Sequence, residues 1–267
     1  MTIYACLLAL VLQASLPFEL PPGFNPDNNY LPVTTDLSSL ETPRGAAALA
    51  EGLIADGSPQ NTELAGRILA AVMEAQETRE GAAHSGNFRL RFSDQAIGDL
   101  NSVQFTLRHL IPMMIRHQDR LPAQLRNRVR ESIRLGLAEI ARMNVSPVYT
   151  NVATMDCMNS SLGGELLRDA SFAARGYERL MELERVTTKN GTFFEYNTPT
   201  YSRVTHDALT RIARHTENKE AAIRARALRA RLALTAALHL HTATGVWAGP
   251  HARGVNLSGD EAAPEQR

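Results

Sequence analysis

The chain has 267 residues, with 28 Lys and Arg against 28 Asp and Glu, and its composition is 44% hydrophobic but only 6% aromatic. This length allows one large domain or two small ones, and it can bury a sizeable core without disulfides or metals. A formal net charge of zero argues against a broad nucleic-acid-binding surface, which needs clustered positive charge. The apolar content excludes disorder of the whole chain. No apolar run reaches the ~18 residues of a membrane-spanning helix, so we expect a globular protein.

The N-terminus has the pattern of a targeting segment. Residues 3–12 read IYACLLALVL and are followed by the small residues Ala14 and Ser15, which predicts a signal peptide over residues 1–15 and a secreted or periplasmic protein. A buried first helix is the alternative, because no Lys or Arg precedes the apolar run. Residues 16–42 contain several prolines and predict an extended lead-in. Removal of the leader would leave Cys157 without an intramolecular disulfide partner.

From Pro43 onward the sequence is a series of helical patterns separated by short breaks. Apolar residues recur with helical spacing and almost no alternating strand pattern is found. Pro112 lies inside one of these patterns and predicts a kink there. The expected helices cover residues 43–55, about 64–76, about 100–114, 122–140, 151–168, 170–188, 200–216 and 219–243.

The short connections predict antiparallel neighbours, so the helices would form αα-hairpins. About four hairpins in a row indicate an all-α protein whose domain, over residues 43–253, is a partial α/α toroid. An ordinary solenoid is the alternative, although no strict repeat of 34 or 40 residues is found. Residues 254–267 are polar and glycine-containing, which predicts a frayed tail.

The segment 191–201 holds the densest group of polar side chains. Glu195, Tyr196, Asn197 and Tyr201 occur in it just before a helix, and Thr198 followed by Pro199 has the pattern of an N-cap and first helical residue. Loops carry functional sites because a rigid scaffold can aim their side chains. The alternative is that the tyrosines pack and the polar residues satisfy the start of the helix.

A second segment, 149–159, places Asn151 and Asn159 on one face of a predicted helix. Amides on a buried face need partners, which a substrate or the neighbouring helix could provide. The simpler interpretation makes Asn151 an N-cap and Asp156 an ordinary surface carboxylate.

A third segment brings Trp247, His251 and Arg253 together in a stretch with Gly and Pro. An indole, an imidazole and a guanidinium suit a sugar ring that carries a carboxylate, and histidine can exchange a proton near neutral pH. The alternative is that Trp247 packs back onto the core. Lower-weight binding candidates precede the long central helix, where a capping role is the alternative for the last of them: Asn87, Arg89 and Asn101.

Several strong signatures are missing. The sequence has no GxxxxGK[ST] or GxGxxG phosphate loop, no HExxH or paired CxxC, and no Gly-x-Ser-x-Gly. We therefore expect no nucleotide cofactor, no dedicated metal site and no esterase nucleophile elbow.

Five sequence elements resemble a family of secreted or uncharacterised α/α-toroid proteins of bacteria, plants and fungi. They are GNFRLRF (86–92), DLNSVQF (99–105), YTNVATMDCMN (149–159), FEYNTPTY (194–201) and AGPHAR (248–253). The similarity spans about residues 60–253, and FEYNTPTY is its most specific part. The relatives continue beyond AGPHAR, which predicts a truncated toroid here. More distantly, the layout is similar to toroid polysaccharide lyases of the heparinase and alginate-lyase kind, although their motifs do not align letter for letter.

The resemblance to these lyases implies β-elimination on an acidic, uronate-containing polysaccharide or oligosaccharide. Matched by residue type, Asn151 would neutralise the uronate carboxylate, Tyr196 or Tyr201 would donate a proton, and His251 would be the base. One alternative is a glycoside hydrolase that uses Glu195 with Asp156 or Asp207 as the second carboxylate. Another is a helical glycan-binding protein without catalytic activity. The common expectation is that Asn151, Glu195, Tyr196, Tyr201 and His251 converge in one pocket, with Asn159, Asn197 and Trp247 nearby.

Overall fold

A computed structural model describes residues 41–244 and 246–252 of the chain. The predicted signal peptide (1–15), the lead-in as far as residue 40, Arg253 and the predicted frayed tail (254–267) lie outside the described residues.

The described chain is mainly helical, which confirms the predicted all-α class. One 3-10 helix and two short strands accompany the α-helices. The elements are α2 (Pro43–Asp56), α3 (Pro59–Glu74), α4 (Ser102–His117), η2 (Gln118–Arg120), α5 (Ala123–Met143), α6 (Thr150–Leu167), α7 (Ala170–Asn190), α8 (Pro199–His215), α9 (Lys219–His239), β1 (Leu240–His241) and β2 (Val246–Trp247).

Local sequence signals place most helix ends. Gly57 adopts a left-handed conformation (φ 78°) directly after α2, and the Ser58 hydroxyl accepts a hydrogen bond from Asn61 N to cap α3. Thr198 and Pro199 are the N-cap and first residue of α8, as predicted. The predicted end of the last helix at residue 243 was wrong. α9 ends at His239 because the chain then turns into β1, which pairs antiparallel with β2.

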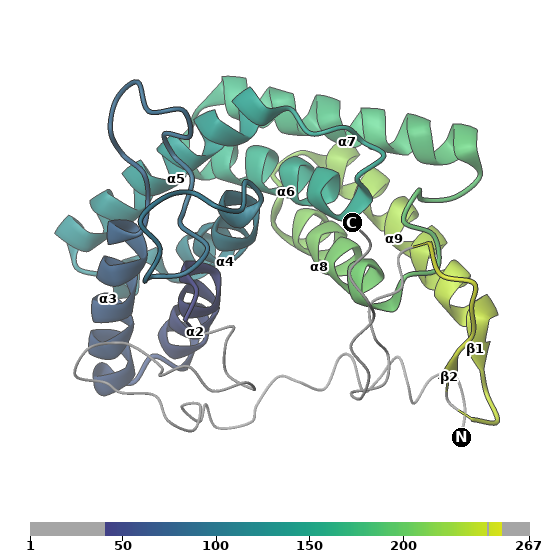
Figure 1. Cartoon of the computed structure of the whole chain (residues 1–267), viewed down its shortest axis with the longest axis horizontal. Coiled ribbons are helices and arrows are strands. Elements are labelled where there is room, and N and C mark those ends of the chain that lie inside the picture. The colour runs from purple at the N-terminus through teal and green to yellow at the C-terminus, as the bar shows by residue number, and fades with distance from the viewer. Residues whose placement is uncertain (1–40, 245, 253–267) are drawn as a thin grey trace.

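The helices form an arch (Figure 1). Helices α6 and α7 lie across the top, α2 to α5 form one side, and α8 and α9 form the other. Short turns join α2 to α3, α6 to α7 and α8 to α9, which gives the predicted helical hairpins. No described helix combines the length and the apolar character that crossing a membrane requires.

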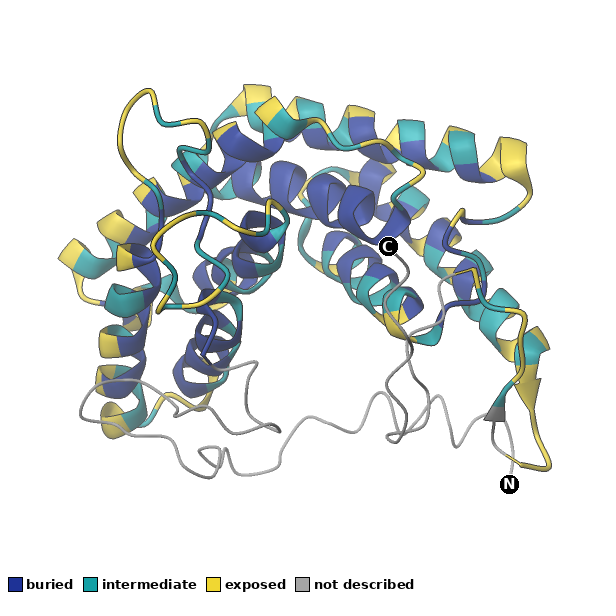
Figure 2. Ribbon diagram, viewed as in Figure 1, coloured by how far each residue is buried: buried dark blue, intermediate teal, exposed yellow. Residues whose placement is uncertain are grey.

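Helix α6 is the centre of the fold and is buried on all sides (Figure 2). Every residue from Thr150 to Gly164 is buried, because α4, α5, α7 and α8 all pack against this helix. The contact with α7 is close: a Cβ on Gly164 would lie 2.2 Å from Ala173 N, and one on Gly176 would lie 2.2 Å from Ser161 N. Several residues in the buried stretch are polar, so their hydrogen bonds must be made inside the protein.

Candidate functional site

The start of α6 is joined to the loop before α8 by a buried amide and a buried carboxylate. Asn151 Nδ2 donates to both carboxylate oxygens of Glu195 at 2.8 Å, and Asn151 N donates to Oε2 at 2.7 Å. The N-cap of α6 is Tyr149, so the expectation that Asn151 is an N-cap was wrong. Glu195 instead receives a free N–H of the first helical turn, where negative charge is favourable.

The next residue of the loop forms a phenol–imidazole pair. The Tyr196 hydroxyl lies 2.7 Å from Nε2 of His239, at the end of α9. The other ring nitrogen of His239 lies 2.7 Å from the Thr235 carbonyl oxygen, which can only accept. Nδ1 must therefore carry the proton, and Nε2 accepts the hydrogen bond from the phenol.

Asn197 connects the same loop to the segment 246–252. Its Nδ2 donates to the carbonyl oxygens of Ala248 at 2.7 Å and Pro250 at 2.9 Å, and its Oδ1 accepts from the indole of Trp247. The ring of His251 contacts the Asn197 carbonyl through Nδ1 at 2.5 Å. Asn197 itself has a positive φ of 50°, a conformation that asparagine tolerates better than most residues.

These contacts bring together six of the twelve residues that the sequence singled out, and we call this group the loop cluster. Its polar atoms are turned toward one another: Glu195 and Asn197 are buried, and Tyr196, Trp247 and His251 are half-buried. The arrangement resembles a structural contact between α6, the loop before α8 and the segment after α9 more than an open binding pocket. Tyr201 is the third residue of α8 and is half-buried. The loop cluster consists of Asn151, Glu195, Tyr196, Asn197, His239, Trp247 and His251.

The remaining predicted binding residues have structural partners elsewhere. Asn87 is fully buried and accepts from Val103 N at the start of α4, while Arg89 donates to the carbonyl oxygens of Glu74 and Asp94. Asn101 is the N-cap residue of α4 without a side-chain capping bond. Asn159 donates to Gln104 Oε1 at 2.9 Å inside the core. Within the described part of the chain, no hydrogen bond or ion pair joins these four residues to the loop cluster.

Asp156, expected as a surface carboxylate, is fully buried. Its oxygens accept from Arg175 and Arg179 of α7 and from the Ser160 hydroxyl. A buried carboxylate needs such donors because isolated charges are costly to bury. Asp156 therefore holds α7 against α6, and it has no accessible oxygen for hydrolysis.

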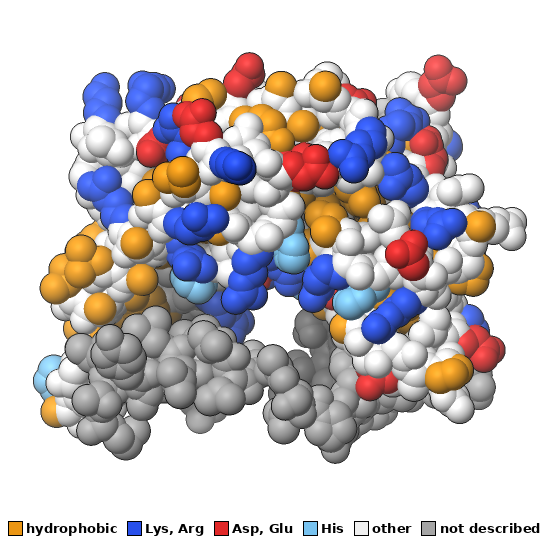
Figure 3. Space-filling model, turned by 180° about the vertical axis from the view of Figure 1, so that it is seen from behind, with side chains coloured by type: hydrophobic (Ala, Val, Ile, Leu, Met, Phe, Trp, Pro, Cys, Tyr) orange, Lys and Arg blue, Asp and Glu red, His pale blue; other side chains and the backbone are white. Residues whose placement is uncertain are grey.

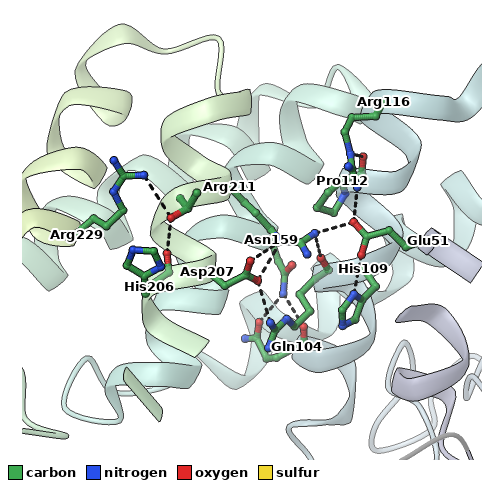
Figure 4. A network of polar contacts seen from close by, with 12 residues as sticks. Glu51, Gln104, His109, Pro112, Arg116, Asn159, His206, Asp207, Arg211 and Arg229 are labelled. Carbon is green, nitrogen blue, oxygen red and sulfur yellow. Dashed lines mark hydrogen bonds and ion pairs between the residues drawn. The ribbon is translucent and has the colours of Figure 1, made fainter. Parts of the chain in front are cut away.

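A second polar group, between α2, α4 and α8, was not expected from the sequence. The carboxylate of Glu51 contacts His109 Nδ1 at 2.8 Å, Arg211 NH1 at 2.9 Å and Arg116 (Figure 4). Asp207 accepts from Arg108 at 2.9 Å and from Arg211 Nε at 3.0 Å. We call this group the arginine cluster. It consists of Glu51, Arg108, His109, Arg116, Asp207 and Arg211.

Three arginines in the arginine cluster face two carboxylates, so the cluster keeps an excess positive charge. Burial alone would raise the pKa of Glu51, but the hydrogen bond from His109 and the charge of Arg211 lower that pKa to about 2. Glu51 is thus ionised at neutral pH, which makes Nδ1 of His109 the donor. Among the described residues, no hydrogen bond uses the other ring nitrogen of His109.

The histidines in and around the cluster are influenced by nearby arginines. Burial lowers the pKa of His109, His206 and His215, and arginines lower each of them further. Arg229 and Arg214 act on His206, while Arg116, Arg211 and Arg214 act on His215. The cluster and these neighbouring arginines therefore create a positive electrostatic potential over this face of α4 and α8.

Basic side chains also gather on one face of the molecule. Figure 3 shows Lys or Arg and His side chains around a hollow in the middle of the face opposite to that of Figure 1. A pocket of about 330 Å³ is lined by both basic and acidic side chains, among them Arg130, Arg168, His215, Glu165 and Glu217, and by no residue of the arginine cluster. A larger pocket of about 1010 Å³ lies between α3 and the start of α5, and none of the residues predicted as functional lines it.

One sequence signal could have indicated the arginine cluster. In α8, Arg203, Asp207, Arg211 and Arg214 follow helical spacing, so they share one face. A row of charged residues with this spacing is also the ordinary pattern of a helix face that is exposed to solvent. The contacts of these α8 side chains with α2 and α4 form only in the folded protein, so they leave no pattern in the sequence.

No group of three or more His, Cys, Asp or Glu side chains in the described ranges is arranged to hold a metal ion. Neither the curated proteins nor the solved structures include a match to this sequence. A family model described as "Domain of unknown function (DUF8769)" matches residues 15–258. The chain therefore belongs to the DUF8769 family.

Proposed function

We propose that this protein binds an acidic, uronate-containing polysaccharide at the arginine cluster and cleaves it by β-elimination. In this proposal the helical arch is part of an α/α toroid, the cluster lies in its cleft, and the protein acts outside the cytoplasm. The observation that carries the proposal is the gathering of Arg108, Arg116 and Arg211 from two helices beside the half-buried His109.

Arginine suits the carboxylates of such a polymer. Its planar guanidinium presents paired N–H donors that match a carboxylate, and it stays charged at all physiological pH values. Arg116 is the most accessible of the three, with 38% of its side chain exposed. A polymer with one carboxylate per sugar could thus place one carboxylate at Arg116 while its neighbours lie over the half-buried arginines.

β-Elimination needs a base and a means of stabilising negative charge. The base removes the proton next to the uronate carboxylate, the electrons of that C–H bond form a C=C bond, and the glycosidic C–O bond on the neighbouring carbon breaks. Arginines at the carboxylate stabilise the enolate-like charge that develops. The oxygen that leaves takes up a proton from a phenol. Tyr201, on the same helix as Asp207 and Arg211, is the candidate, since the Tyr196 hydroxyl is bonded to His239 in the loop cluster.

We assign the base to His109 rather than to His251. His109 lies among the arginines, and its contact with Glu51 orients the ring and leaves Nε2 to accept a proton. Its pKa is lowered by burial, so the ring is neutral near pH 7 and able to act as a base. His251 is held in the loop cluster by the Asn197 carbonyl.

The test is incubation with alginate, pectin, glucuronan and glycosaminoglycans, followed by the absorbance of unsaturated uronate. We expect absorbance to rise with at least one of them, and His109→Gln to abolish the rise while binding persists. Arg211→Gln should weaken binding. Arg134→Gln is the matched control, because Arg134 forms an exposed pair with Glu131 on α5. Absence of both binding and absorbance change with every polymer would refute the proposal, as would equal binding to single-stranded DNA.

A glycan-binding protein without catalysis is the second candidate. It is favoured by one observation: Asn151 and Glu195, predicted for catalysis, bond each other, and Asn197, predicted for substrate binding, bonds the segment 246–252. Binding without absorbance change, unaffected by His109→Gln, would support this candidate. Glycoside hydrolysis has less support, because Asp156 and Asp207 are both held by two arginines.

A further inference from the structure

Pro112 lies inside α4, where proline is the least favourable residue for a helix. A proline at this position has no N–H to donate to the carbonyl oxygen four residues earlier. That carbonyl belongs to Arg108 of the arginine cluster. It would be left without its helical hydrogen bond in a buried part of the protein, which is costly unless another donor replaces it.

The replacement donor comes from another helix. Arg211 of α8 donates from NH1 to the Arg108 carbonyl oxygen at 3.1 Å. The remaining contacts of Arg211 are to carboxylates: Glu51 Oε1 at 2.9 Å from NH1 and Asp207 Oδ2 at 3.0 Å from Nε. The Arg108 carbonyl is therefore the neutral acceptor of Arg211. It holds the guanidinium against the backbone of α4, and a backbone oxygen cannot rotate away as a side chain can.

A second arginine is held by a backbone oxygen of α4. Arg116 donates from Nε to the carbonyl oxygen of Pro112 at 3.1 Å, and its Nη2 contacts Glu51. Two arginines that meet at Glu51 are thus each held by a backbone oxygen, and the two oxygens lie one helical turn apart on α4.

We infer that Pro112 is a positioning residue of the anion site: its missing N–H leaves the Arg108 carbonyl to orient Arg211 toward a bound carboxylate. This inference rests on the proposed function of the arginine cluster. It explains why a helix-breaking residue stands in the middle of the helix that contributes three residues to that cluster.

The test is Pro112→Ala, which gives α4 the missing N–H and lets it compete with Arg211 for the carbonyl oxygen. The probes are inorganic sulfate and a hexameric oligouronate, titrated by calorimetry. We expect affinity for both probes to fall about three- to tenfold, since an ionic hydrogen bond that orients Arg211 is weakened. The melting temperature should not fall, since alanine favours the helix.

Pro59→Ala is the matched control, because Pro59 is the first residue of α3 and its N–H would have no helical partner in any case. This control should leave affinity unchanged.

A double-mutant comparison separates positioning from general disturbance. In an Arg211→Lys background, Pro112→Ala should have no further effect on affinity, because the guanidinium that it positions is gone. An equal loss of affinity in both backgrounds, or no loss in the parent protein, would overturn the inference.

The inference can be decided even if the proposed function fails. Should the unaltered protein bind neither probe, hydrogen exchange of the Arg211 side-chain N–H groups, followed by NMR, replaces the titration. Faster exchange in Pro112→Ala than in the unaltered protein would support the positioning role, and equal exchange would contradict it.

Discussion

The amide of Asn197 accepts a hydrogen bond from the indole of Trp247, 50 residues further along the chain. The same amide donates to the carbonyl oxygens of Ala248 and Pro250. One side chain at the start of α8 therefore fixes the path of the segment that follows α9. The same loop is also connected to the core, because Glu195, two residues earlier, accepts a hydrogen bond from the first turn of α6.

The three hydrogen bonds of the Asn197 side chain predict the behaviour of two variants. Asn197→Gly keeps the positive φ accessible but removes all three hydrogen bonds, whereas Asn197→Ala removes them and adds backbone strain. We expect a loss of unfolding free energy of about 1–3 kcal/mol for the glycine variant and about 1 kcal/mol more for alanine. The chain has one tryptophan, so its emission should shift to longer wavelength in both variants. Unchanged emission in Asn197→Gly would contradict the role of the amide, and Asn190→Ala, at an exposed helix end, is the control.

The arginine cluster predicts a loss of stability in acid. Glu51 has a pKa of about 2 in the folded protein against 4.5 for the model compound, so its contribution is complete above pH ~4.5 and is lost as pH falls from there toward 2. This contribution is about 3 kcal/mol. The pKa of His109 is also lowered, from 6.5 by burial, so the folded state favours the neutral ring and loses stability as pH falls below 6.5. The two effects have the same sign.

Urea denaturation between pH 2 and pH 8 measures this dependence. Glu51→Gln should lower the unfolding free energy at pH 7 by about 3 kcal/mol, because it leaves buried arginines without their partner. It should also flatten the loss below pH 4.5, and His109→Gln should flatten the part that begins near pH 6.5. Glu131→Gln, in an exposed ion pair, should change stability by less than about 1 kcal/mol. A pH profile of Glu51→Gln that runs parallel to the parent profile would rule out this origin of acid sensitivity.

The contact between α6 and α7 predicts a large effect of a single methyl group. A Cβ on Gly176 would meet the backbone of Ser161 at 2.2 Å, so Gly176→Ala must push α6 and α7 apart. We expect a loss of about 3 kcal/mol or more. Gly98→Ala is the matched control, because nothing lies within 4 Å of the added carbon, and it should be neutral or slightly stabilising. Similar melting temperatures for the two variants would show that the helices do not pack this closely.

Anion binding at the arginine cluster should be coupled to proton uptake. Burial and the surrounding arginines lower the pKa of His206 and His215 in the free protein, and a bound anion would offset part of the positive charge and raise both values. Affinity for an oligouronate should therefore increase as pH falls from 8 toward 6. Calorimetry in two buffers of different ionisation enthalpy measures the protons taken up. Proton release, or affinity independent of pH, would argue against binding beside these histidines.

The sequence predicted the helices closely and the functional residues unevenly. Thr198 and Pro199 start α8 as expected, because capping depends on residues that are neighbours in the chain. The grouping of Asn151, Glu195, Tyr196, Asn197, Trp247 and His251 is found in the structure, but these groups mostly satisfy each other. Asp156 was placed wrongly, because helical spacing alone cannot show that α6 is covered on every side.

What the sequence determined by itself is a chain of helical hairpins, since capping residues, glycine and proline act over a few residues. It also showed a formal charge of zero, which argues against a broad nucleic-acid-binding surface. Only the tertiary structure decided where those charges lie. Glu51, Arg108 and Arg211 come from three helices, up to 160 positions apart, and their attraction is decided by how the helices pack. The same packing buries enough of each side chain to make these charges act on one another at low effective dielectric.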